Sequence, residues 1–266
     1  MRRSRGAFSL LVVLGSIVLG GCSSNPPITA GPGQADQALL ERGNAALKEE
    51  QWIRAREFYS ELLNNYPQSP VRADAKLALG DAYLGEDTAA SLVYAQNEYR
   101  EFLSFYPTSS RADYAQMQLG MVHYNQMLNP QRDQSETKEA IREFQTFMDR
   151  YPGSPLAPQV KQRLRESKDR LSDWDVAVGN FYLNIRAYSS AEQRYRYVLE
   201  HDPEYSHRDS LFFHLAETLE KSEKKAEALP YYERLVEEFE QSEYLQEAKR
   251  RIDLLRGELK AATSGL

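Results

Sequence analysis

Residues 55–67 read AREFYSELLNNYP, in which Ala55 is followed by Tyr59 on the same helical face and then by Pro67. The proline prevents the helix from continuing. The arrangement occurs four more times, with glutamate replacing proline in the last copy: Ala95, Tyr99 and Pro107; Ala140, Phe144 and Pro152; Ala191, Tyr195 and Pro203; Ala228, Tyr232 and Glu240. Five copies at matching offsets indicate a repeat protein rather than one compact core.

A small residue lies upstream of each copy and marks a first helix in each repeat. The five residues are Gly43, Gly80, Gly120, Gly179 and Ala216. In the first, fourth and fifth copies the spacing to the later Ala is that of tetratricopeptide helix pairs. The second and third copies are longer, which predicts longer turns near Gly85–Thr88 and Asn129–Thr137. Small residues let the two helix backbones approach, and we expect the aromatic ring to fill the gap toward the next repeat.

The rest of the chain supports an all-α fold of this type. The 266 residues contain no long strand-like alternation, and most prolines lie between helical stretches or in the N-terminal tail. The amphipathic, charged stretch 242–262 is typical of a cap helix that solvates the end of an array. We therefore expect a superhelix of five tetratricopeptide-type helix pairs plus a C-terminal cap helix. Repeats one to three are expected over 37–156, and repeats four and five with the cap over 157–262.

The N-terminus has the features of a bacterial lipoprotein signal. Arginines at positions 2, 3 and 5 precede a short apolar run, 8–19, which is too short to span a membrane comfortably. Leu19-Gly20-Gly21-Cys22 then matches a lipobox, and Cys22 is the only cysteine of the chain. We interpret 1–21 as a signal peptide and Cys22 as the lipidation site, the alternative being an ordinary signal peptide with an incidental cysteine.

The segment that follows the lipobox and the net negative charge of the chain further restrict its possible functions. Residues 22–36 are rich in Ser, Pro and Gly, which predicts a disordered lipidated tether. Ser23 after the lipobox is compatible with export to the outer membrane. The chain carries a formal charge of -6, and a chain this acidic is a poor candidate for nucleic-acid binding. We expect a lipid-anchored protein on the periplasmic face of the outer membrane.

The first helices of repeats one to three carry apolar residues where a soluble array would usually carry polar ones. These are Leu40, Leu47, Leu77, Leu84, Tyr114, Met117, Met121 and Tyr124. Met and Tyr in a concave groove suit an extended or helical peptide with aromatic side chains. The alternative is that these residues only pack the first helices of neighbouring repeats together.

No enzymatic constellation is evident in the sequence. The four histidines are not spaced as metal ligands with Cys or Glu, and no nucleophile pattern or phosphate-binding loop stands out. The many carboxylates read as solvated helix faces. We therefore expect no cofactor, no metal and no catalytic residue, and a protein that works by binding other proteins.

The lipobox and the repeats together resemble the BamD family, also called ComL or YfiO, of outer-membrane assembly lipoproteins. The most specific stretch is 161–182, including Lys168-Asp169-Arg170-Leu171 and Phe181-Tyr182, with Trp174-Asp175 where the family has Tyr-Glu. Further matches are Asp113-Tyr114 and Arg150-Tyr151-Pro152. The resemblance covers nearly the whole chain after the signal peptide.

The resemblance implies a scaffold in the β-barrel assembly machine of the outer membrane. Its N-terminal repeats would bind targeting signals of unfolded outer-membrane proteins, and its C-terminal repeats would bind the POTRA domain of a BamA-like barrel subunit. Arg194 occupies the place of a family arginine linked to that contact, and its alternative interpretation is an ordinary solvated helix arginine. Other Bam lipoproteins are possible partners. A tetratricopeptide lipoprotein scaffold in cell-wall or cell-division complexes is the alternative function.

Overall fold

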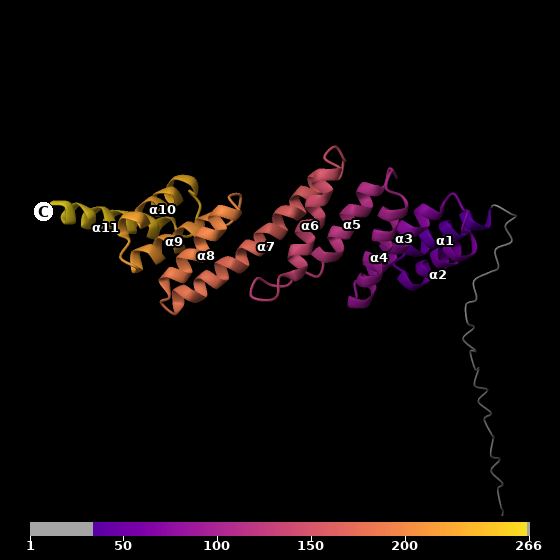
Figure 1. Cartoon of the computed structure of the whole chain (residues 1–266), viewed down its shortest axis with the longest axis horizontal. Helices are drawn as coiled ribbons and strands as arrows, with labels where there is room; N and C mark the ends of the chain where they lie inside the picture. The colour runs from indigo at the N-terminus through magenta and orange to yellow at the C-terminus, as the bar shows by residue number, and fades with distance from the viewer. Residues whose placement is uncertain (1–33, 265–266) are drawn as a thin grey trace, which may run out of the picture.

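The computed structural model describes residues 34–264, and this part of the chain consists of eleven α-helices with no strand (Figure 1). The helices are α1 Ala35–Lys48, α2 Trp52–Asn65, α3 Arg72–Glu86, α4 Ala89–Phe105, α5 Ala112–Tyr124, α6 Ser135–Arg150, α7 Ala157–Asn184, α8 Tyr188–His201, α9 Arg208–Lys221, α10 Lys225–Glu238 and α11 Leu245–Ser264. The predicted signal peptide, Cys22 and nearly all of the predicted tether lie outside the described residues. The all-α prediction is confirmed.

The helices form five consecutive pairs and a final single helix. Figure 1 shows them stacked side by side along one axis, from α1 at the right to α11 at the left. Each helix packs mainly on its two neighbours in sequence. This quasi-linear arrangement is the tetratricopeptide-type superhelix that the repeat spacing predicts. In each pair we call the first helix A and the second helix B, so that α2, α4, α6, α8 and α10 are B helices.

The small residue of helix A lies directly under the aromatic ring of helix B in the same repeat. A β-carbon placed on Gly43 would lie 2.3 Å from Tyr59, and one on Gly179 would lie 2.5 Å from Tyr195. The Tyr59 and Tyr195 side chains are fully buried. The absence of a β-carbon creates the space for the ring within its own pair. The ring also reaches the next repeat, as expected, since the Tyr195 and His214 rings stack with their centroids 6.4 Å apart.

The tyrosine hydroxyls explain why the residue after the small one is polar in several repeats. Tyr59 donates a hydrogen bond to Asn44 over 2.9 Å, and Tyr195 donates to Asn180 over 2.6 Å. Repeat three has the apolar Met121 in that place, and its ring is Phe144, which has no hydroxyl. A buried hydroxyl needs a partner, so the two positions agree within each of these repeats.

The turns inside the pairs differ from two sequence expectations. Four of them place a residue with positive φ just after helix A: Glu50, Asp87, Arg186 and Glu223. The extra residues of repeat two do not lengthen its turn near Gly85–Thr88. They lengthen the helices instead, because α3 runs to Glu86 and Thr88 caps α4 through Ser91. In repeat three the long turn occupies 125–134, a few residues earlier than expected, since α6 already begins at Ser135.

The longest helix, α7 Ala157–Asn184, begins at the expected repeat boundary and contacts the repeats on both sides of it. Its 28 residues contain no glycine or proline between Pro158 and Gly179, so nothing in the sequence interrupts it. Its first half packs on α6 through Val160 and Leu164, while its second half is helix A of the fourth repeat and packs on α8. Residues 157–171 therefore continue repeat three rather than belonging to repeat four alone.

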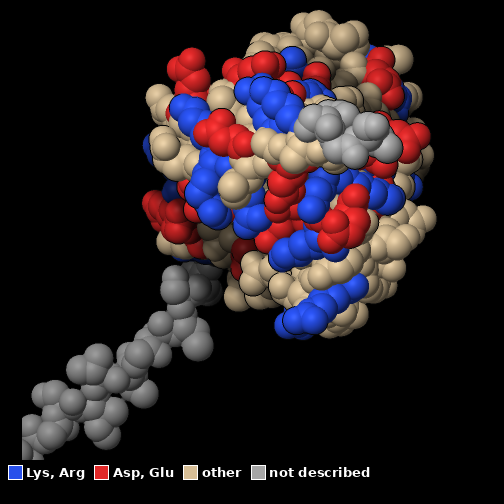
Figure 2. Space-filling view, turned by 90° about the vertical axis from the view of Figure 1, so that its left-hand side faces the viewer, with Lys and Arg blue, Asp and Glu red and all other residues tan. Residues whose placement is uncertain are grey.

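The last helix, α11, closes the array with a charged surface. Figure 2 views this end of the molecule and shows Lys and Arg interspersed with Asp and Glu. Arg251 bonds both Glu247 and Glu220, which ties α11 to α9. A polar outer face is what the end of a repeat array requires. Among the described helices, none combines the length and the apolar composition that crossing a membrane would need.

Candidate protein-binding site

The structure buries three of the eight residues that were predicted to line a peptide groove. The Leu40, Leu77 and Met117 side chains are covered by neighbouring helices. In this state they pack helices together, as the alternative interpretation supposed. The other five are half-buried: Leu47, Leu84, Tyr114, Met121 and Tyr124. The peptide groove stays a prediction for these five.

Tyr114 belongs to a hydrogen-bond network between repeats two and three. Its hydroxyl donates to Asp81 over 2.9 Å, and Tyr99 donates to the same carboxylate oxygen over 2.7 Å. Burial raises the pKa of Asp81, while these hydrogen bonds act in the opposite direction. The Arg111 guanidinium lies 5.1 Å from the Tyr114 ring centroid. Tyr114 is thus held by polar contacts on helix A and has one partly exposed face.

Tyr124 is held in a comparable way by the first half of α7. Its hydroxyl donates to Glu166 over 2.6 Å and accepts from Arg163 over 3.1 Å. The Arg163 guanidinium also lies 4.9 Å from the ring centroid. Burial opposes ionisation of Glu166, yet the hydrogen bonds from Tyr124 and Arg163 lower its pKa. A partly exposed tyrosine beside a cation suits an aromatic or carboxylate group of a peptide.

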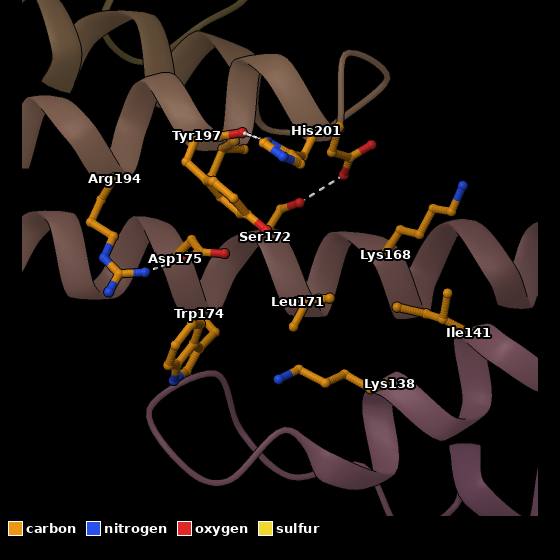
Figure 3. Close-up of a pocket in the computed structure, with 12 residues that line it drawn as sticks. Lys138, Ile141, Lys168, Leu171, Ser172, Trp174, Asp175, Arg194, Tyr197 and His201 are labelled. Carbon is orange, nitrogen blue, oxygen red and sulfur yellow. Dashed lines mark hydrogen bonds and ion pairs between the residues drawn. The ribbon is translucent and has the colours of Figure 1, made fainter.

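A cavity of about 280 Å³ lies between α6 and α8, over the middle of α7. Figure 3 shows α7 passing between Lys138 and Ile141 of α6 and the α8 residues Arg194, Tyr197 and His201. Leu171 and Trp174 of α7 form part of the wall. The cavity therefore combines apolar surface with a few charged groups, as protein-binding hot spots do.

Arg194 stands at one end of this cavity, on the face of α8 that looks toward α7. Its guanidinium forms an ion pair with Asp175 over 3.1 Å and lies 5.8 Å from the Trp174 ring. Burial raises the pKa of Asp175, and the charge of Arg194 counteracts this. The Arg194 side chain remains 40% exposed. It can therefore bind a carboxylate of a partner protein while it keeps its ion pair with Asp175.

Another part of the cavity wall is fixed by a partly buried hydrogen-bonded cluster. Arg165 donates to both carboxylate oxygens of Asp202, at 2.8 and 2.5 Å, and Ser172 donates to Asp202 over 2.7 Å. Beside them the Tyr197 and His201 rings stack with centroids 3.9 Å apart. These contacts hold α8 rigidly on α7, so the cavity is preformed rather than dependent on a mobile loop.

Sequence reasoning found Arg194 and missed most of the side chains around it. Lys138 and Lys168 line the cavity. In the sequence alone, nothing distinguishes these two lysines from those on ordinary solvent-exposed helix faces. One signal was present in the sequence. Residues 157–171 repeat the helix A pattern, with Arg165 in the place of the small residue. A small residue in helix A leaves space for the aromatic ring of its helix B. Where helix A has no small residue, we therefore expect that no such ring packs on it.

His123, Glu139 and Glu143 lie close together but form no separate site. Their possible ligand atoms fall within 4.8 Å of one another. Both ring nitrogens of His123 are already engaged, with Gln96 at 2.9 Å and Glu136 at 2.7 Å. The buried imidazole therefore joins α4, α5 and α6.

Comparison with known proteins identifies the family. The model of the family described as "YfiO: Outer membrane lipoprotein" matches residues 32–228, which is well over half of the chain. The chain belongs to the YfiO family. The resemblance seen in the sequence is confirmed, and the matched region contains both the predicted groove and the cavity around Arg194.

Curated relatives of this YfiO-family chain carry one name, outer membrane protein assembly factor BamD. The protein from Vibrio cholerae is 28% identical over 187 residues, covering 66% of this chain and 76% of its own length. The protein from Caulobacter vibrioides is 25% identical over 218 residues, covering 81% of this chain and 70% of its own length.

Two solved structures that are similar to the chain are tetratricopeptide proteins. The yeast Sti1 TPR2AB domain complex has a TM-score of 0.45 at 13% identity, with 87% of each chain covered. A tetratricopeptide repeat protein from Parabacteroides merdae has a TM-score of 0.37 at 16% identity, with 87% of this chain and 77% of that chain covered.

Proposed function

We propose that this chain is a scaffold for outer-membrane protein assembly and that it works by binding, without catalysis. The family match and the name of its relatives support the assembly role. In this proposal Cys22 carries the lipid that anchors the chain to the periplasmic face of the outer membrane. The C-terminal repeats bind the periplasmic POTRA domain of the barrel subunit, and the N-terminal repeats bind segments of unfolded outer-membrane proteins.

The observation that carries the proposal is the setting of Arg194. It is partly exposed at the rim of a preformed cavity, beside an exposed aromatic surface and paired with a buried carboxylate. Arginine and tryptophan in such a setting are the residue types that dominate binding energy at interfaces. In this proposal a carboxylate of the barrel subunit binds Arg194 at this end of the cavity and shares it with Asp175.

The test measures binding of the periplasmic domains of the barrel subunit to the detergent-extracted chain. Arg194→Glu should weaken binding by at least about tenfold, because loss of a hot-spot arginine costs about 2 kcal/mol or more. Arg100→Glu, on the exposed surface of α4, is the matched control and should leave binding unchanged. Equal affinities for the Arg194→Glu variant and the original chain would refute this assignment of the partner surface.

The N-terminal part of the proposal is tested separately in cells. A photoreactive residue in place of Tyr124 should form adducts with unfolded outer-membrane proteins, whereas one in place of the exposed Val93 of α4 should not. Adducts of equal yield at the two positions would mean that the half-buried groove has no special role in binding such segments.

A further inference from the structure

Helix α7 contains two copies of helix A joined end to end, with no turn and no helix B between them. In the first copy Val160, Leu164 and Ser167 occupy the positions that face the preceding helix B. In the second copy the corresponding positions follow 14 residues later, so that 160, 164 and 167 become 174, 178 and 181. The array therefore lacks one helix B, and its place lies between α6 and α8.

The first copy is covered in the ordinary way. Val160 and Ser167 are 0% exposed, and Leu164 is buried against α6. The second copy has no such cover. Phe181 is 59% exposed, although the equivalent residues of α3, α5 and α9 (Ala82, Val122 and Thr218) are at most 1% exposed. Since those helices pack on the preceding helix B, the exposure of Phe181 results from the missing helix.

These residues form one continuous apolar stripe along α7 and its C-cap. Leu171, Trp174, Val178, Phe181 and Ile185 are spaced three or four residues apart, which places them on a single face of the helix. The first three are half-buried. Ile185 is also exposed, at 57%. The stripe begins inside the cavity, whose walls are Leu171 and Trp174, and runs from there to the end of α7. We call this stripe and the cavity together the α7 groove.

The charges at the cavity end of the α7 groove favour an acidic occupant. Lys138 of α6 and Lys168 of α7 both line it, and within the described residues neither ammonium group forms an ion pair. The two carboxylates of the lining, Asp175 and Asp202, are already paired with Arg194 and Arg165. Figure 3 shows the two lysines on either side of Leu171 and Ile141. Two cations flanking an apolar surface match a partner helix whose apolar face is bordered by Asp or Glu.

We propose that the α7 groove receives an amphipathic, acidic helix from the partner protein, which takes the place of the missing helix B. On α3, α5 and α9 the equivalent face is covered by the preceding helix B of the chain itself. The fold therefore shows that a helix fits this face of α7. The proposal rests on the proposed function for the identity of the partner, the barrel subunit. The form of the occupant follows from the repeat geometry alone.

The test is photo-crosslinking in cells of the full chain with p-benzoylphenylalanine in place of Phe181 or Ile185. The crosslinked partner peptide is then mapped by mass spectrometry. The expected peptide belongs to a helix with apolar residues three or four apart and carboxylates beside them. A second arm reverses the two lysines, Lys138→Glu and Lys168→Glu, and should reduce the adduct at least about fivefold. Lys161→Glu, on the exposed side of the same helix, is the matched control.

The outcomes separate this inference from the proposed function. Adducts on a strand or loop peptide, adducts with a second copy of the chain, or an adduct insensitive to the lysine reversals would overturn the helix proposal. Co-purification of the barrel subunit with the unsubstituted full chain is measured in parallel. If the barrel subunit co-purifies while position 181 captures nothing, the α7 groove proposal fails and the function stands. If position 181 captures an acidic helix of a protein outside outer-membrane assembly, the partner assignment fails and the groove stands.

Discussion

Replacing Gly179 by alanine should destabilise the fold, although alanine is the better helix former. An added β-carbon would lie 2.5 Å from Cε1 of Tyr195 and 2.9 Å from Cδ1 and Cζ. Ordinary carbon contacts need about 3.5–4.0 Å, so the ring would have to retreat by about 1 Å. It has little room, because the ring is fully buried and its hydroxyl is held by Asn180 at 2.6 Å.

The magnitude follows from three opposing contributions. Overpacking a buried site costs about 1–3 kcal/mol, and weakening the tyrosine hydrogen bond costs about 0.5–1.5 kcal/mol. The gain in helix propensity from glycine to alanine is about 1 kcal/mol. The net loss for Gly179→Ala is therefore about 0.5–3.5 kcal/mol, and the melting temperature should fall by about 2–4 °C for each kcal/mol.

Urea and thermal unfolding followed by circular dichroism measure the effect, and the chain offers two controls. Gly257 lies in α11, and an added β-carbon there would have no atom within 4 Å, so Gly257→Ala should stabilise by about 0.5–1 kcal/mol. The double variant Gly179→Ala with Tyr195→Leu should lose less than the sum of the two single losses, because the smaller side chain relieves the clash. The reasoning is refuted if Gly179→Ala is as stable as the original chain, or if the two losses add fully.

Two further predictions concern the turn before α8 and the acid sensitivity of the array. Arg186 has a φ of 62°, and this conformation costs a residue with a side chain about 1–2 kcal/mol. Arg186→Gly should therefore raise the free energy of unfolding by about 0.5–1 kcal/mol. An equal gain from Arg186→Ala would contradict backbone strain as the cause. Glu192 bonds Arg196 and Lys224 at 2.8 and 2.9 Å, and although burial opposes ionisation, these partners lower its pKa below the ordinary 4.5. A lowered folded pKa means that its stabilising contribution is complete above pH 4.5 and is lost as the pH falls through the folded value. Glu192→Gln should thus lower the urea midpoint at pH 6 and have a much smaller effect near pH 3. Glu200→Gln, on the exposed side of α8, is the control and should have little effect at either pH. A loss of stability for Glu192→Gln that does not change with pH would contradict the role assigned to the Glu192 carboxylate.

The repeat architecture could be predicted from the sequence because it depends on the spacing of residues that are close together in the chain. Pairs such as Ala55 and Tyr59 set one helical face, and Tyr66-Pro67 ends the helix within a few residues of that face. The five pairs and the cap helix follow from such short-range rules, since each helix contacts mainly its neighbours in the chain.

Packing between helices was predicted less well, because it depends on which face of each helix is covered. Val122 and Phe181 are both apolar, and both lie two residues after the small residue of an A helix. The first is 1% exposed and the second is 59% exposed. No local pattern separates them, since the difference arises from whether another helix B precedes them in space.

The sequence by itself determined that this is a chain of helical pairs and where the second helices that precede a proline end. It also placed Arg194 on a second helix of the fourth pair. Only the tertiary structure decided that α7 runs unbroken for 28 residues and leaves one face without its covering helix. The physical reason is that a helix end is set by the residues on either side of it, whereas burial of a face is set by what the rest of the molecule places against it.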